Sequence, residues 1–139
     1  MDPQEARRRF AAARVARLAT VGAGGAPHLV PLVFAVAGDE VLSAVDAKPK
    51  RTTALRRLAN VRHEPRVALL ADHYDEDWRA LWWVRADGVA RVLAPEDEDA
   101  RRAVALLAER YAPYRDAPPA GPVLAVAVTR WSGWAAAGG

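Results

Sequence analysis

The chain has 139 residues, which suits one hydrophobic core, and we expect residues 1–139 to form a single domain. It contains no cysteine, which excludes disulfides, thiolate metal sites and cysteine nucleophiles. No run of about 18 uncharged apolar residues occurs, and the N-terminus lacks the apolar region of a signal peptide. We therefore expect no membrane association and a cytoplasmic location.

The net charge of +3 is small, and the arginines are spread along the chain. Nucleic-acid binding usually requires a concentrated basic surface, so we expect no nucleic-acid partner. A localised anionic ligand fits this distribution better.

The first half of the chain predicts one helix and three strands. The helix is expected over residues 3–13. Asp2 can cap it, Pro3 suits its first position, and Glu5 completes a capping box. The strands are expected over residues 15–21, 28–36 and 40–45, with turns at residues 22–27 and 37–39. Pro31 interrupts the second strand, which implies an edge, a bulge or a kink there.

The second half predicts two helices and three strands. One helix is expected from Thr52 or Thr53 to Arg62, and the other over residues 95–111. The strands are expected over residues 66–71, 81–93 and 123–128, with an acidic loop at 72–78 and an irregular connection at 111–122. The strand at 66–71 is almost continuously apolar, which predicts that both of its faces are covered.

Most of the predicted strands are joined to the next strand by a tight turn, and not by a crossover helix. This order predicts a mainly β fold, in which an antiparallel sheet closes on itself and helices pack outside it.

The segment Lys48-Pro49-Lys50-Arg51-Thr52 is the strongest candidate site. The chain has only two lysines, and both lie in this loop, directly before a predicted helix. A helix N-terminus attracts phosphate, and lysine, arginine and threonine side chains add charge and hydrogen-bond donors. The segment therefore indicates a phosphate cradle, although a solvated basic turn with a threonine cap explains the same residues.

The glycine, histidine and tryptophan motifs are weaker indications of a functional site than this loop. The glycines at residues 22–25 lie between two strands, which favours a hairpin turn over a dinucleotide site. His28, His63 and His73 share no metal-ligand spacing, so no metal site is expected. Trp82 and Trp83 point to opposite faces if they lie in a strand, so one of them is expected to meet a partner subunit or a ligand.

Three pairs of segments resemble a known superfamily. Residues 14–21 and 27–34 resemble the first hairpin of the pyridoxamine 5′-phosphate oxidase-like split β-barrel superfamily. Residues 45–52 and 55–61 resemble its deazaflavin-dependent branch, the coenzyme F420-dependent oxidoreductases of actinobacteria. Residues 72–78 and 81–85, with the sequence Trp-Trp-Val-Arg, continue this similarity.

The resemblance implies a homodimer with two cofactor sites at the subunit interface. The implied cofactor-binding residues are His28, Val30, Pro31, Lys48, Lys50, Arg51, Thr52, Asn60 and Trp83. The strand that carries His28 would lie along the cofactor ring, and the loop at residues 48–52 would hold its phosphate and acidic tail.

The function implied is hydride transfer from reduced F420 to a small conjugated organic acceptor. There are two alternatives: an oxidoreductase of the same superfamily that binds FMN, and a carrier protein that binds F420 without catalysis. No catalytic acid or base is assigned, since His28, His73, Tyr74 or a bound water are all candidates for the proton donor.

Overall fold

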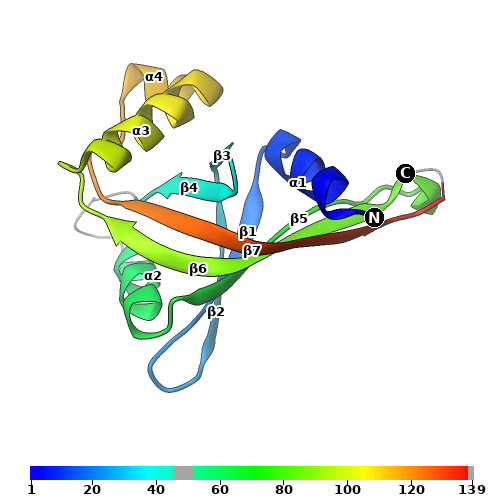
Figure 1. Cartoon of the computed structure of the whole chain (residues 1–139), viewed down its shortest axis with the longest axis horizontal. Helices are drawn as coiled ribbons and strands as arrows, with labels where there is room; N and C mark the ends of the chain where they lie inside the picture. Colours follow the sequence, from blue (N-terminus) through cyan, green and yellow to red (C-terminus); the bar gives the residue numbers. More distant parts are fainter. Residues whose placement is uncertain (46–51, 138–139) are drawn as a thin grey trace.

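The computed structural model describes residues 1–45 and 52–137 (Figure 1). The helices in the described ranges are α1 (Pro3–Ala12), α2 (Thr52–His63), the short 3-10 helix η1 (Trp78–Ala80), α3 (Glu98–Arg110) and α4 (Ala112–Asp116). The strands there are β1 (Ala16–Val21), β2 (Pro27–Leu32), β3 (Ala35–Ala37), β4 (Glu40–Ala44), β5 (Arg66–His73), β6 (Trp82–Leu93) and β7 (Val123–Ala135). Within these ranges, no helix is both long enough and apolar enough to cross a membrane.

The described strands form one antiparallel sheet with the order β2-β1-β5-β6-β7-β4-β3. The two edge strands, β2 and β3, are neighbours in the chain, and only residues 33–34 separate them. A connection this short spans roughly 10 Å at most, so the two edges must approach one another. The sheet therefore curls into a barrel that stays open between β2 and β3, as the turn-rich sequence predicts.

Local sequence signals set several element boundaries as expected. The Asp2 carboxylate accepts a hydrogen bond from the Glu5 backbone N–H at 2.8 Å, which caps α1 as predicted. Gly25 has a φ of 81° in the β1–β2 turn, and Gly38 has a φ of 60° in the β3–β4 turn. These positive φ angles favour glycine, and both predicted hairpins are confirmed.

The strand expected over residues 28–36 is divided in two. β2 ends at Leu32 and pairs with β1, whereas β3 begins at Ala35 and pairs with β4. The chain thus leaves one edge of the sheet and enters the other. Pro31 lies opposite Arg17 in the edge strand β2, where a missing N–H donor is tolerated.

Three expectations for the second half do not hold in the single chain. β7 continues to Ala135 because it pairs with β6 along its whole length, and a bulge near Gly88 absorbs one extra residue. Residues 112–116 form α4, with Pro113 in its first turn, where proline is tolerated. β5 has one uncovered face, since its buried and exposed side chains alternate and Leu70 is 38% exposed.

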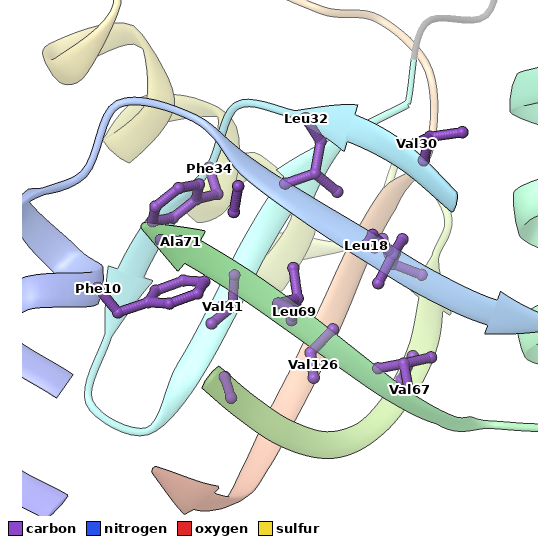
Figure 2. Close-up of a cluster of buried hydrophobic side chains, with 14 of the residues drawn as sticks. Phe10, Leu18, Val30, Leu32, Phe34, Val41, Val67, Leu69, Ala71 and Val126 are labelled. Atoms are coloured by element: carbon purple, nitrogen blue, oxygen red, sulfur yellow. The ribbon is translucent and has the colours of Figure 1, made fainter. Parts of the chain in front are cut away.

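The main core lies inside the curled sheet. Figure 2 shows apolar side chains from the strands converging with Phe10 of α1. Among the described side chains of α2, Leu58 and Val61 join this core, so α1 and α2 both contribute to the interior.

α3 packs on the outside of the barrel instead. Its buried residues Ala100 and Ala103 meet Leu42 of β4 and Val123 of β7. α3 thus covers the outer face of one part of the sheet.

Candidate functional site

A small polar cluster lies on the inner face of the β1–β2 hairpin. Thr20 and His28 are directly opposite in the antiparallel register, so their side chains share one face. Asn60 of α2 reaches the same place, and its side-chain Nδ2 donates a hydrogen bond to Thr20 Oγ1 at 3.0 Å. Thr20 and Asn60 are both buried. The cluster joins the hairpin to α2.

His28 is the member of this cluster with unused hydrogen-bonding capacity. The residue is half-buried, and its Nδ1 is buried without a hydrogen-bond partner among the described residues. Buried polar atoms in folded proteins are nearly always paired, so this nitrogen is available to a ligand. It can donate or accept according to its protonation state.

Gly22 keeps the cluster close to the hairpin turn. A Cβ at this position would lie 3.3 Å from Asn60 Oδ1, so a larger side chain would press on the amide. The Gly22 N–H donates to Ala26 O at 3.0 Å and holds the turn in place. Sequence patterns missed the roles of Thr20 and Gly22, because both depend on the position of a residue in the distant helix α2.

Two further predicted residues of β2 fall on opposite faces of the sheet. Val30 is buried in the core, on the same inner face as His28. Pro31 is exposed on the outer face, in one row with Arg17, Leu70 and Arg85. The structure therefore brings His28, Val30 and Asn60 together and places Pro31 apart from them.

The adjacent tryptophans of β6 also point to opposite faces, as predicted. Trp82 packs against the core, its ring is stacked on His73 at a centroid distance of 6.4 Å, and Arg9 lies 5.5 Å from its ring. Trp83 lies on the outer face, directly opposite Trp134 of β7. The Arg85 guanidinium lies 5.8 Å from the Trp83 ring.

The outer face of the sheet carries a shallow hollow of about 570 Å³. Leu29 and Leu70 are among its apolar lining residues, and Arg17, Asp72 and Arg85 are its charged ones. Arg17 and Asp72 form a long ion pair at 3.9 Å. Leu29 is 68% exposed, which is unusual for a leucine in a strand. The hollow is an apolar surface with charges of both signs.

The predicted phosphate loop is described only at its end. Lys48, Lys50 and Arg51 lie outside the described residues. Thr52 is the first residue of α2, and the structure gives its helical backbone. The first turn of α2 contains no acidic residue, so no side chain of that turn neutralises the positive end of the helix dipole.

Solved structures with the same fold include several from mycobacteria. The conserved hypothetical protein Rv2991 from Mycobacterium tuberculosis matches with a TM-score of 0.75 and 25% identity, over 97% of this chain and 85% of that one. The FAD binding protein from Mycobacterium smegmatis matches with a TM-score of 0.66 and 22% identity, over 96% and 95% of the two chains.

A third structure, the heme binding protein from M. smegmatis, matches with a TM-score of 0.75 and 22% identity. The match covers 99% of this chain but only 55% of that one, so this chain spans about half the length of that protein. At these identities the likeness to the two M. smegmatis proteins establishes the fold.

No curated protein matches the sequence significantly. The profile of the family described as pyridoxamine 5′-phosphate oxidase matches residues 2–135, which is nearly the whole chain. Both this match and the antiparallel curled sheet with flanking helices agree with the predicted split barrel. The chain therefore belongs to the pyridoxamine 5′-phosphate oxidase family.

Proposed function

We propose that the protein is an F420-dependent oxidoreductase that reduces a small conjugated organic acceptor. The support comes from the family membership together with the sequence Lys48-Pro49-Lys50-Arg51-Thr52, which resembles the deazaflavin-dependent branch. The bound coenzyme would supply the hydride. The chain would bind its anionic arm, orient its ring and exclude water from the ring.

The described residues fit a planar, polar ligand. The observation that carries the proposal is the buried, unpartnered Nδ1 of His28, which offers a hydrogen bond at the edge strand β2. Asn60 and Val30 lie on the same side of the sheet as His28. In the proposed site, His28 bonds the ring system and Val30 supplies apolar contact. Lys48, Lys50, Arg51 and the start of α2 at Thr52 hold the phosphate.

Pro31 and Trp83 would meet the proposed ligand through a second copy of the chain. Both lie on the outer face of the sheet, whereas His28 lies on the inner face, so one planar ligand cannot contact all three in a single chain. We propose that the outer face of one subunit packs on its partner in a homodimer. The exposed Leu29 and Leu70 supply apolar area, and the mixture of Arg17 and Asp72 suits a self-complementary interface.

Two alternatives within the family use the same cradle. FMN carries a phosphate that would bind at the same loop, and a carrier would hold the coenzyme without turnover. Structural neighbours of this chain include proteins described as FAD-binding and heme-binding, which makes both compounds necessary competitors in a binding test.

The binding test uses purified protein and the quenching of its tryptophan fluorescence. F420, FMN, FAD and heme are titrated separately at one ionic strength. We expect F420 to bind most tightly, with FMN weaker. Tight binding of FMN, FAD or heme with no response to F420 would overturn the proposed coenzyme.

The catalytic test uses reduced F420 with a panel of quinones and enones. Oxidation of the coenzyme is followed by its absorbance, with and without the protein. Turnover of at least one acceptor class supports an oxidoreductase. Tight F420 binding with no turnover across the panel would instead establish the carrier alternative.

A further inference from the structure

A groove runs along one side of α1, beside the turn that joins β3 to β4. α1 buries Ala6 and Phe10 against the core, and Figure 2 shows the Phe10 ring among the core side chains. The volume of the groove is about 630 Å³, which falls within the range of roughly 300–1,000 Å³ for pockets that hold small molecules. The lining includes Pro3, Arg7, Arg8 and Ala11 of α1, and Asp39 and Trp131 complete it.

Trp131 of β7 gives this groove a fixed apolar wall. Its indole Nε1 donates a hydrogen bond to Asp39 Oδ1 at 3.0 Å, and its ring meets the Phe10 ring edge-on at a centroid distance of 5.5 Å. These two contacts hold the indole in one orientation between the core and the groove. Because the wall is ordered before a ligand arrives, binding against it costs less conformational entropy.

Arg7 supplies a positive charge to the same groove. Its Nε donates a hydrogen bond to Gly38 O at 2.7 Å and lies 3.6 Å from Asp39 Oδ1. Both contacts use Nε, so within the part of the chain that the structure describes the two terminal amino groups remain for a ligand. A guanidinium whose position is already fixed can bind a carboxylate with two charge-assisted hydrogen bonds.

The charges around the groove favour an anion over a cation. Its described lining contains two guanidinium groups, those of Arg7 and Arg8, and one carboxylate, that of Asp39. The Asp39 carboxylate already accepts the Trp131 N–H and lies beside Arg7, so it offers little to a cationic ligand. An anionic group therefore pairs with the arginines, and the apolar part of the ligand lies against Trp131, Pro3 and Ala11.

The groove is separate from the proposed cofactor site. That site is built from the β1–β2 hairpin, with His28, and from α2, with Asn60. The groove is instead lined by α1, the β3–β4 turn and β7, and it shares no described residue with the polar cluster around His28.

We infer that this groove is a second binding site, which takes a small organic acid with an aromatic ring. The carboxylate pairs with Arg7 and Arg8, and the ring packs on Trp131. The inference goes beyond the proposed function, because it depends on no coenzyme.

The test uses 2-naphthoate and its uncharged counterpart 2-naphthamide as probes. Binding is followed in ¹H–¹⁵N spectra through the indole N–H signal of Trp131, which Trp131→Phe identifies by its loss. We expect 2-naphthoate to shift this signal in a saturable way, and 2-naphthamide to bind about tenfold more weakly. No shift of this signal by 2-naphthoate, or equal affinities for the two probes, would overturn the inference.

Two arginine variants test the source of this preference. Arg7→Met removes the guanidinium from the groove, whereas Arg101→Met removes an exposed one from α3. We expect Arg7→Met to bind the acid and the amide with nearly equal affinity, and Arg101→Met to keep the preference of the wild type. A preference for the acid that is the same in both variants would refute the role of Arg7.

A second pair of variants keeps both groove arginines. Ala11→Phe fills the groove, and Ala105→Phe adds the same ring at an exposed position of α3. We expect Ala11→Phe to abolish the 2-naphthoate shift and Ala105→Phe to leave it unchanged. This pair decides the question if Arg7→Met does not fold, since unaltered binding by Ala11→Phe would place the probe elsewhere.

Competition distinguishes the groove from the coenzyme site. F420 at saturation should leave the affinity for 2-naphthoate unchanged. Displacement of the probe by F420 would overturn the inference, because one site would then hold both compounds. If F420 does not bind at all while 2-naphthoate still shifts the Trp131 signal, the groove stands and the proposed coenzyme fails.

Discussion

The buried amide of Asn60 donates a hydrogen bond to the buried hydroxyl of Thr20 at 3.0 Å, across 40 positions of sequence. This bond joins α2 to β1 beside His28. It therefore fixes the helix that begins at Thr52 relative to the edge strand that the ligand is proposed to contact.

Replacement of Thr20 by valine should destabilise the protein by about 1–3 kcal/mol, because the Asn60 N–H would remain buried without an acceptor. The free energy of unfolding in urea measures this loss. The pair Thr20→Val and Asn60→Leu should be strongly non-additive in a double-mutant cycle. Additive effects of the two changes would show that the bond contributes nothing.

Tyr111 connects three separated segments through one hydroxyl. This oxygen accepts a hydrogen bond from the Phe34 backbone N–H at 3.2 Å, and it lies 2.9 Å from Phe34 O and 3.0 Å from Arg14 O. Tyr111→Phe leaves the Phe34 N–H unpaired and should cost about 1–3 kcal/mol. Tyr74→Phe is the matched control, because Tyr74 is 69% exposed. Equal stabilities of the two variants in urea would refute the role of this hydroxyl.

Glu64 predicts a specific pH dependence. Its hydrogen bonds with Arg66 lower the pKa of Glu64 from 4.5 to about 2. Since the pKa is lower in the folded protein, the ionised carboxylate stabilises the fold above pH 4.5, and this contribution disappears as the pH falls toward 2. The wild type should melt above Glu64→Gln at pH 7, and the difference should vanish in acid.

The Arg66 side chain is exposed to solvent and Glu64 is half-buried, so the difference in melting temperature should be small and should shrink in high salt. Glu76→Gln is the control, since Glu76 is an exposed carboxylate for which the described residues provide no ion pair. A difference that persists unchanged at pH 2.5 would contradict the assignment.

The proposed phosphate loop is tested by Lys50→Ala combined with Arg51→Ala. Charge-assisted hydrogen bonds contribute roughly 1.5–3 kcal/mol each, so coenzyme affinity should fall by at least about tenfold. The melting temperature should hardly change. An unaltered dissociation constant in the fluorescence titration would move the phosphate site elsewhere.

The proposed homodimer is tested by Leu29→Asp. Leu29 is 68% exposed in the single chain, so the change should not harm the isolated fold. It should nevertheless shift the protein to monomers in light scattering, because it places a charge in an apolar interface. Val15→Asp is the control, since Val15 is 40% exposed but lies before β1. A monomeric wild type in the same measurement would refute the proposed homodimer.

The sequence predicted elements better than the contacts between them. Asp2, Gly25 and Gly38 act on their immediate neighbours, so the cap and both hairpins could be predicted from local patterns. The polar end of β7 could not, because Arg130 and Ser132 are polar residues that lie in the strand through their pairing with Asp87 and Arg85 of β6.

The candidate site shows the same limit. His28 and Asn60 were predicted from the resemblance, but Thr20 emerges as a neighbour of both only after the chain has folded. Arg7 likewise looks the same as Arg8 in the sequence. Its bond with Gly38 O depends on how α1 sits against the β3–β4 turn, which no local pattern encodes.

The sheet order also constrains how the chain acquires its structure during synthesis. β4 pairs with β7, so Glu40 finds its partner in Ala127, near the end of the described chain. Until the ribosome releases β7, the nascent β3–β4 hairpin therefore has no partner for the free edge of β4. Such distant pairings slow folding to milliseconds or longer, and barrel closure must follow translation of the last strand.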